Sequence, residues 1–329
     1  MHTMSIRDTQ FCASALSVTG LRKAYGDVTV LDGVDLDVPP GSVFALLGAN
    51  GAGKTTMVRI LSTLTPPDAG TVHVAGHDLR RDPQGVRRKI SLTGQYAAVD
   101  DLLTGEENLR LMARLSHLGR AEGKRRAREL LEQFDLVDAR TRRAGTYSGG
   151  MTRRLDLAMS LISRPDVIFL DEPTTGLDPR GRQSMWEMIR RLVDGGVTLF
   201  LTTQYLEEAD RLADRVAVLD GGRVVAEGTP DELKRLVPGG HLELTFTRPS
   251  ELHDVAQAFD DAVLDADRLA VQVPTDGSIG QLKTLLGRID DQSVTVDKLS
   301  LHSPDLDDVF FALTDNSNAS PIRNEAAAR

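Results

Sequence analysis

The segment FALLGANGAGKTT, residues 44–56, constrains the fold of this chain more than any other stretch. A short apolar run leads into it, and residues typical of a helix follow it. From Gly48 to Thr55 it matches G-x-x-x-x-G-K-[ST], in which glycines let successive backbone amides point at phosphate oxygens. The positive end of the following helix adds to this attraction. The sequence therefore predicts a strand, a phosphate-binding loop and a helix.

The side chains of this loop indicate how a nucleotide is held. We expect Lys54 to bridge the β- and γ-phosphates and the Thr55 hydroxyl to bind Mg²⁺. A structural glycine turn is the alternative, but the flanking strand and helix favour phosphate binding. The predicted phosphate-binding residues are Gly48, Asn50, Gly51, Gly53, Lys54, Thr55 and Thr56.

A second apolar run, DVIFLDEP at residues 166–173, ends in two acidic residues. We expect Asp171 to hold Mg²⁺ through water, and Glu172 to orient or deprotonate an attacking water. An acidic pair after a strand is often only the start of a loop. The phosphate-binding loop upstream in the same predicted sheet favours the catalytic interpretation.

The chain from residue 16 to about 228 alternates strand-like and helical runs, which is typical of an α/β fold with a covered sheet. Short apolar runs at 42–48, 167–171, 197–203 and 215–220 predict the core strands. An alternating run at 18–41 predicts an antiparallel layer. Apolar residues three and four apart at 105–119, 122–136 and 148–163 predict an inserted helical subdomain at about 96–164.

A different pattern follows the VPGG segment at residues 237–240: strand, helix, strand, strand, helix, strand. This order predicts a small ferredoxin-like α+β domain, which we interpret as a dimerisation or regulatory module. The predicted organisation is a flexible leader at 1–15, a nucleotide-binding domain at 16–236, the accessory α+β domain at 241–315 and a disordered tail at 316–329. The helix predicted at 305–315 closes the accessory domain.

Composition limits the partners of the chain. The 329 residues carry a formal net charge of −9, which disfavours a nucleic acid partner. We find no run near the roughly 20 apolar residues that a membrane-spanning helix needs. The N-terminus lacks the basic and apolar regions of a secretion signal, which predicts a cytoplasmic location. Cys12, the single cysteine, is expected to be a plain thiol in the leader.

The segment YSGGM, residues 147–151, resembles the signature motif of ATP-binding-cassette (ABC) ATPases, and it precedes the VIFLDEP strand as in that family. The resemblance implies an ABC-type nucleotide-binding domain that hydrolyses ATP. It assigns Tyr25 to stacking on adenine, Gln95 to Mg²⁺ and the attacking water, and the TTGLDP loop with Asp178 to nucleotide binding. In the family, residues such as Ser148, Gly149 and Gly150 meet the γ-phosphate held by a second subunit. It therefore implies a homodimer that encloses two ATP molecules.

The segment LTTQYLEEAD, with Gln204 at the end of a predicted strand, narrows the resemblance. Most ABC ATPases have histidine there, donating to the γ-phosphate; a carboxamide also donates N–H groups but does not titrate. Together with YSGGM and PDLDDVFFALT, this glutamine resembles the daunorubicin/doxorubicin-resistance type. That type implies drug or natural-product export through separate permease subunits, with the ATPase held peripherally at the cytoplasmic face of the cell membrane.

Two alternatives remain at this point. One is a soluble ABC ATPase acting on ribosomes or DNA, although such proteins usually have two cassettes or a long coiled-coil insertion. The other is a regulatory module that binds nucleotide without turnover. Intact Lys54, Asp171 and Glu172 argue against the second, whereas Gln204 and Met151 leave the rate of hydrolysis open.

Overall fold

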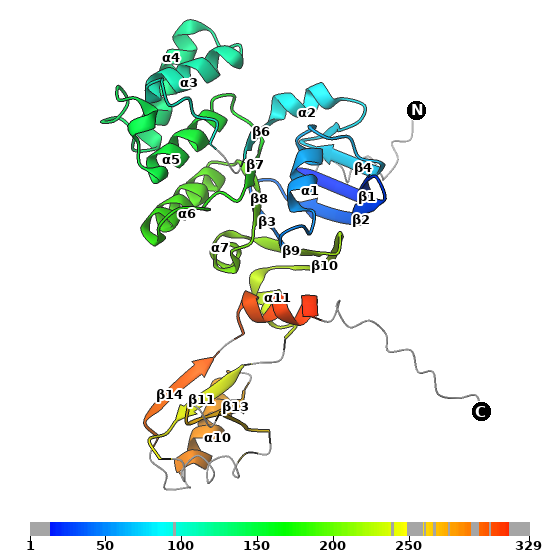
Figure 1. Ribbon diagram of the computed structural model, residues 1–329, viewed down its shortest axis with the longest axis vertical. Coiled ribbons are helices and arrows are strands. Elements are labelled where there is room, and N and C mark those ends of the chain that lie inside the picture. The colour runs from blue at the N-terminus through cyan, green and yellow to red at the C-terminus, as the bar shows by residue number, and fades with distance from the viewer. Residues whose placement is uncertain are drawn as a thin grey trace, which may run out of the picture. The chain divides into compact units, whose positions relative to one another are not determined.

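The computed structural model describes residues 14–94, 97–237, 240–248, 259, 261–265, 268–275, 277–290, 296–302 and 304–315 (Figure 1). The chain divides into two compact units, Met1–Pro230 and Asp231–Arg329. Residues 1–13 of the predicted leader, Gln95 and the tail from residue 316 lie outside the described residues, whereas Ala15, the last residue of that leader, is buried in the core. The predicted domain limits at 236 and 241 stay a prediction.

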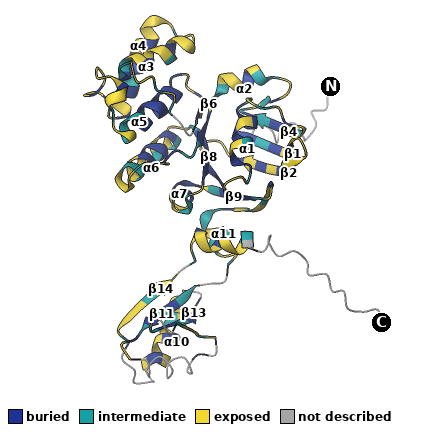
Figure 2. Cartoon of the chain, viewed as in Figure 1, coloured by how far each residue is buried: buried dark blue, intermediate teal, exposed yellow. Residues whose placement is uncertain are grey.

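The first unit contains a six-stranded sheet in the order β10-β9-β3-β8-β7-β6, parallel except for the β9–β10 hairpin. The strands are β3 (Val43–Leu47), β6 (Ile90–Thr93), β7 (Val167–Asp171), β8 (Thr198–Thr203), β9 (Arg215–Asp220) and β10 (Arg223–Gly228). Burial on both faces explains their continuous apolar runs, and Figure 2 shows the middle strands buried. All four predicted core strands are confirmed.

A four-stranded antiparallel sheet in the order β2-β1-β4-β5 lies beside the central sheet. Its strands are β1 (Leu16–Tyr25), β2 (Val28–Val38), β4 (Ala69–Val74) and β5 (His77–Asp78). One hydrophobic core joins Leu21 of β1, Met57 of α1 (Lys54–Leu61) and Phe44 of β3. Helix α1 therefore packs into the core that both sheets share, which confirms the predicted antiparallel layer. Helix α2 (Pro83–Lys89) leads into β6.

Three helices between β6 and β7 form the predicted helical subdomain, which Figure 1 shows as a separate group. They are α3 (Gly105–Leu115), α4 (Arg120–Gln133) and α5 (Gly149–Ser160), with a short 3₁₀ turn at Ala144–Thr146. A capping box between Thr104 and Glu107 starts α3. The prediction of helix up to residue 119 was wrong, because α3 ends at Leu115 and His117 takes a left-handed φ of 57°. Helices α6 (Pro179–Asp194), α7 (Leu206–Leu212) and α8 (Pro230–Lys234) follow later in the chain.

The second unit has a four-stranded antiparallel sheet in the order β12-β13-β11-β14. Its elements are β11 (His241–Thr245), β12 (Val263–Asp265), β13 (Ala270–Pro274), α10 (Ile279–Asp290), β14 (Lys298–His302) and α11 (Leu306–Asp315). This strand order is that of the predicted ferredoxin-like unit. The helix predicted at 250–259 lies outside the described residues apart from Phe259, which is buried in the core of this unit.

The helices among the described residues are all too short or too polar to cross a bilayer.

Candidate nucleotide-binding site

The register of the central sheet brings the predicted catalytic residues to one edge. Leu47 of β3 pairs with Thr203 of β8, and Thr202 of β8 pairs with Asp171 of β7. The residues that follow these strands are the phosphate-binding loop, Gln204 and Glu172. The carboxyl edge of a parallel sheet is where ligands bind in α/β folds. Distant parts of the sequence therefore meet where a nucleotide can be bound.

The loop between β3 and α1 has the backbone that anion binding requires. Gly51 and Gly53 take left-handed φ values of 86° and 109°. A Cβ on Gly53 would lie 2.9 Å from the Val30 carbonyl oxygen, so only glycine fits there. No side chain caps the start of α1, which leaves its first amides to a ligand. Asn50 and Thr55 are exposed beside these amides, and Thr56 is half-buried.

Lys54 spans the loop from the first turn of α1. Its Nζ atom donates to the carbonyl oxygens of Gly48 at 2.6 Å and Ala49 at 3.1 Å. Burial lowers the pKa of Lys54, while the charges of Glu172 and Asp171 act in the opposite direction. The ammonium group therefore lies within the field of both acidic side chains.

The end of β7 holds its two carboxylates differently. Thr202 Oγ1 donates to Asp171 Oδ1 at 2.5 Å, and Thr175 Oγ1 donates to Glu172 Oε2 at 3.2 Å. Glu172 has a left-handed φ of 51°, and its backbone N–H donates to the Thr202 carbonyl at 3.0 Å. A non-glycine residue in this region persists only where its surroundings hold it. The strand thus ends in a sharp turn that separates the two side chains.

The remaining predicted contacts of this site are Tyr25, Gln204 and Gln95. Tyr25 ends β1 in the antiparallel sheet and is 49% exposed, so its ring is available for stacking. The Nζ atom of Lys23 lies 5.3 Å from the centre of this ring. Gln204 is exposed at the end of β8, whereas the placement of Gln95 is outside the described residues.

A separate pocket of about 490 Å³ contains the signature residues. Ser148 caps α5 by accepting from the Met151 N–H at 3.3 Å, and Asp178 caps α6 by accepting from the Gly181 N–H at 2.8 Å. Gly149 and Gly150 line the same pocket, whose lining includes no residue of the 48–56 loop. The structure therefore groups the predicted nucleotide contacts in two places, with the signature group apart from the phosphate-binding loop.

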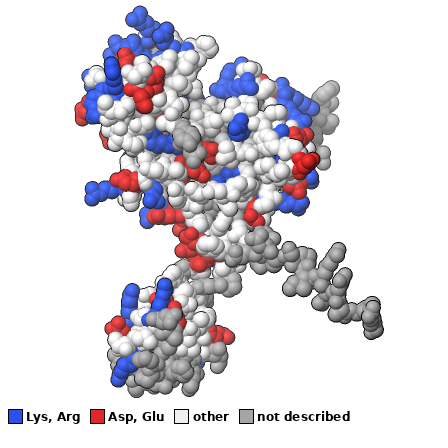
Figure 3. Space-filling view, viewed as in Figure 1, with Lys and Arg blue, Asp and Glu red and all other residues white. Residues whose placement is uncertain are grey.

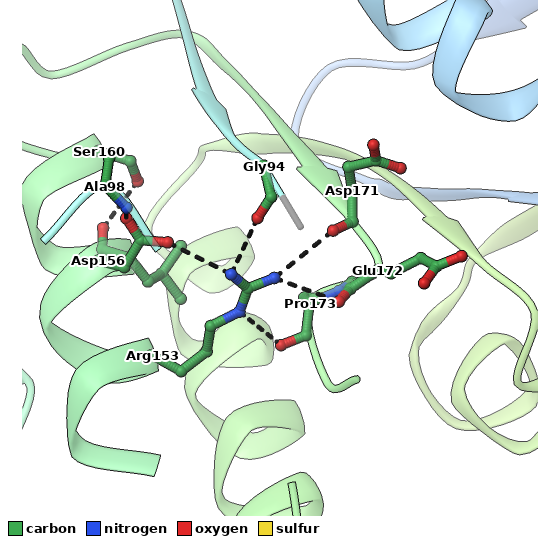
Figure 4. A network of polar contacts seen from close by, with 9 residues as sticks. Gly94, Ala98, Arg153, Asp156, Ser160, Asp171, Glu172 and Pro173 are labelled. Atoms are coloured by element: carbon green, nitrogen blue, oxygen red, sulfur yellow. Dashed lines mark hydrogen bonds and ion pairs between the residues drawn. The ribbon is translucent and has the colours of Figure 1, made fainter. Parts of the chain in front are cut away.

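Sequence reasoning missed two features of the hydrolytic edge. One is Thr202, a fully buried polar residue in an apolar strand that reads as an ordinary β-branched strand former. The other is a buried network around Arg153 of α5, drawn in Figure 4. Its signal was a pair of opposite charges, Arg153 and Asp156, three residues apart in a largely apolar helical run.

The phosphate-binding loop and the acidic end of β7 lie on the same edge of the sheet. An inserted subdomain adds a helix that begins with two glycines. Together these features define an ATP-binding-cassette ATPase. The family model described as "ABC transporter" matches residues 31–175. A solved dimeric ATP-binding cassette in a post-hydrolysis state with ADP and Pi is 26% identical, with a TM-score of 0.59, covering 65% of this chain and 98% of that one.

Sequence relatives extend the match over nearly the whole chain. Daunorubicin resistance ATP-binding protein DrrA2 of Streptomyces coeruleorubidus is 50% identical over 318 residues, covering 95% of this chain and 99% of that protein. Daunorubicin/doxorubicin resistance ATP-binding protein DrrA of Streptomyces peucetius is 47% identical over 326 residues, covering 95% and 96%. The chain belongs to the ABC transporter ATP-binding proteins, and within them to the daunorubicin/doxorubicin-resistance type. The predicted resemblance, ATPase class and fold are confirmed.

Proposed function

We propose that this chain is the ATP-hydrolysing subunit of an exporter that moves a drug or natural product through separate membrane subunits. The observation that carries the proposal is the division of the nucleotide contacts between two places on one chain. The phosphate-binding loop lies at one, and the Ser148–Gly150 start of α5 lies at the other. A head-to-tail homodimer joins each loop to the partner's signature group.

The two signature glycines support this arrangement. A Cβ on Gly150 would meet nothing within 4 Å, and one on Gly149 would meet only Leu177 Cδ2 at 4.0 Å. Neither residue has a left-handed φ, so neither its backbone nor its neighbours among the described residues require glycine. Glycine at such a position serves the close approach of something from outside. The γ-phosphate bound by a second copy is the group we assign to it.

The hydrolytic roles follow from the sheet edge. The loop amides and Lys54 bind the phosphates, Tyr25 stacks on the adenine, and Gln204 donates to the γ-phosphate. Glu172 orients or deprotonates the attacking water, and Gln95 remains a predicted contact of that water. ATP bound between two subunits favours the closed dimer more than ADP does, so binding and hydrolysis drive closing and opening.

The residues present fit Mg²⁺. Among the described residues, no group of three or more His, Cys, Asp or Glu side chains could hold a metal. Mg²⁺ does not need such a group, because it keeps several waters and takes one or two protein oxygens with the phosphates. Thr55 and Asp171 would hold it here, and Gln95 is a further predicted ligand. When bound, the ion neutralises charge on the β- and γ-phosphates.

The loop that leads into α3 is the surface that we assign to the permease. Leu102 is 77% exposed on this loop, in the helical subdomain shortly before α3 begins. Over that subdomain, Lys and Arg side chains are interspersed with acidic ones on the face drawn in Figure 3. A surface of mixed charge with exposed leucine favours a protein partner over a nucleic acid backbone. The partner would hold the chain at the cytoplasmic face of the membrane.

The decisive experiment measures phosphate release and molar mass together. The purified chain should hydrolyse ATP, and Glu172→Gln should abolish turnover while running as a dimer in ATP and as a monomer without nucleotide. A Glu172→Gln chain that stays monomeric in saturating ATP would contradict the sandwich. Absence of turnover in the wild-type chain, alone and with its permease, would favour a nucleotide-gated module.

Coupling to the membrane subunit needs its own test. Leu102→Asp should retain the ATPase activity of the isolated chain but lose its stimulation by membranes that contain the permease. The matched control is Leu64→Asp, which changes an exposed leucine outside this loop. Equal stimulation of both variants would show that this loop is not the docking surface for the permease.

A further inference from the structure

The guanidinium group of Arg153 lies at the point where helix α5 meets the end of β7. Its Nε atom donates to the Pro173 carbonyl at 2.8 Å, and Nη2 donates to the carbonyls of Glu172 at 3.1 Å and Asp171 at 3.5 Å (Figure 4). The side chain thus contacts three consecutive backbone carbonyls. These are the residues that present both acidic side chains to the nucleotide.

The same side chain also reaches the loop after β6. Nη1 donates to the Gly94 carbonyl at 2.9 Å and lies 3.4 Å from Asp156 Oδ2. Asp156 in turn accepts from the Ala98 N–H at 3.0 Å through its other oxygen. Gly94 and Ala98 flank Gln95 in the sequence. Arg153 and Asp156, one turn apart on α5, therefore connect the two chain segments that carry the predicted water-contacting residues.

The backbone of Glu172 explains why such a clamp matters. Its left-handed φ of 51° is unfavourable for a residue with a Cβ. The N–H group of Glu172 donates to the Thr202 carbonyl, and its carbonyl oxygen accepts from Arg153 at 3.1 Å and from the Thr175 N–H at 3.3 Å. If the Arg153 contact is lost, only the longer bond from the Thr175 N–H still holds this carbonyl, and the peptide that follows Glu172 can relax. A displacement of this carboxylate by about 1 Å is enough to reduce a rate about 100-fold.

We propose that Arg153, held in turn by Asp156, is a positioning residue for ATP hydrolysis that fixes the backbone of Glu172 relative to the loop after β6 and to helix α5. The proposal rests on the ATPase activity of the chain. Helix α5 begins with the signature residues at Ser148, which we assign to the phosphate bound by the partner. The same helix carries Arg153, which holds the backbone of Glu172. One helix therefore connects the two contacts.

Because Arg153 and Asp156 are both buried, single and double substitutions of this pair can distinguish a positioning role in catalysis from a role in stability. Arg153 is 7% exposed and Asp156 is 4% exposed. Burial lowers the pKa of the guanidinium and raises the pKa of the carboxyl, so both charges are held at a desolvation cost. Replacing a whole buried pair by apolar side chains is often neutral for stability, whereas removing one partner is strongly destabilising. A double substitution therefore removes the clamp without leaving a buried charge alone.

The experiment compares Arg153→Met, the double variant Arg153→Met/Asp156→Leu, and Arg126→Met. Arg126 is the matched control: it pairs with Glu129 three residues on and donates to the Leu161 carbonyl at 3.1 Å, away from β7. Arg153→Met should unfold at lower urea than the wild type, and the double variant should recover most of that loss. In the double variant kcat should fall about 30- to 100-fold with KM for ATP within about threefold, because the phosphate-binding loop is untouched. Arg126→Met should keep the wild-type kcat.

Arg153→Lys covers the case in which the double variant does not fold. Lysine keeps the charge beside Asp156, but one ammonium group cannot span from the Gly94 carbonyl to the Pro173 carbonyl. Its kcat should fall at least about tenfold, again without a matching rise in KM. Wild-type kcat in the double variant, or in Arg153→Lys, would overturn the positioning role. A wild-type chain without turnover would contradict the ATPase function itself, and the inference with it.

Discussion

The Thr202 hydroxyl donates to the Asp171 carboxylate at 2.5 Å, across the parallel pair β8–β7. Asp171 is the last residue of β7 and Thr202 is the last but one of β8, and the bond uses one carboxylate oxygen while the other remains for a ligand. Groups that hydrogen-bond to a metal-binding side chain fix its orientation, and their removal weakens metal binding. Asp171 belongs to the predicted site, whereas Thr202 does not.

Thr202→Val should therefore raise the Mg²⁺ concentration for half-maximal ATP hydrolysis about tenfold or more. Valine has the branched shape of threonine and removes only the hydroxyl of this fully buried side chain, so the fold should persist with a loss of stability of about 1–3 kcal/mol from the missing hydrogen bond. Titration of the hydrolysis rate with Mg²⁺ at saturating ATP checks this expectation. Thr198→Val is the control, because Thr198 is buried at the opposite end of β8, where it accepts from the Gly41 N–H at 2.9 Å. The same Mg²⁺ dependence in both variants would contradict the role of Thr202.

Gly150→Ala should leave the folded monomer intact and reduce its ATP turnover. An added Cβ meets open space, and alanine favours a helix over glycine by up to about 1 kcal/mol. Urea unfolding should show equal or greater stability. ATP turnover should fall at least tenfold, because one oriented contact to the transition state is lost. When Gly150→Ala is added to Glu172→Gln, ATP-dependent dimerisation should weaken at least tenfold as well. Gly119→Ala, another helix-start glycine with open space around it, is the control. Normal turnover in Gly150→Ala would argue against a phosphate contact.

Gln204 should tolerate histidine but not glutamate. Histidine donates an N–H group as glutamine does, so Gln204→His should keep turnover within about tenfold. Its rate should gain a titration step near the ordinary histidine pKa of about 6.5, a step absent from the wild type. Gln204→Glu has the same shape but only accepts, so we expect at least a 100-fold loss of turnover. Hydrolysis rates of the wild type, Gln204→His and Gln204→Glu measured from pH 5.5 to 8.5 check these expectations. An active Gln204→Glu would contradict the contact between Gln204 and the γ-phosphate.

The fold was predictable where one local pattern dictates one structure. The runs that became β3, β7 and β8 are apolar on both faces, because the sheet is covered on both sides. The glycine spacing of the 48–55 loop likewise leaves few backbone shapes. Helix ends were less predictable: α3 stops where His117 turns left-handed, and no proline or glycine marks that position.

The contacts of Arg153 were not predictable for a physical reason. Its acceptors are backbone carbonyls 20 residues away at Pro173 and 59 residues away at Gly94. Every residue has a carbonyl, so an acceptor of this kind leaves no mark in the side-chain pattern. The predicted site thus consists of side chains that we assign to the nucleotide, and it lacked the groups that hold the backbone of Glu172.

Glu208 of α7 should make the stability of the fold depend on pH. It is fully buried, and the Trp186 indole N–H donates to its Oε1 atom at 3.2 Å. Burial raises the pKa of this carboxyl above its ordinary value of 4.5. Between pH 4.5 and the raised value, the folded chain binds more protons at this site than the unfolded chain does. The contribution of Glu208 to the free energy of unfolding must then fall as pH rises, by up to about 1.4 kcal/mol per pH unit within that window.

Glu208→Gln removes this titration while keeping a carbonyl oxygen for Trp186. The free energy of unfolding of the wild type minus that of Glu208→Gln should therefore be largest near pH 4.5 and decrease towards pH 8. Urea unfolding across this range measures the difference. Glu207→Gln removes an exposed carboxylate from the same helix and controls for the change in net charge. If the difference between wild type and Glu208→Gln stayed constant from pH 4.5 to 8, Glu208 would not be the residue through which burial links folding to pH.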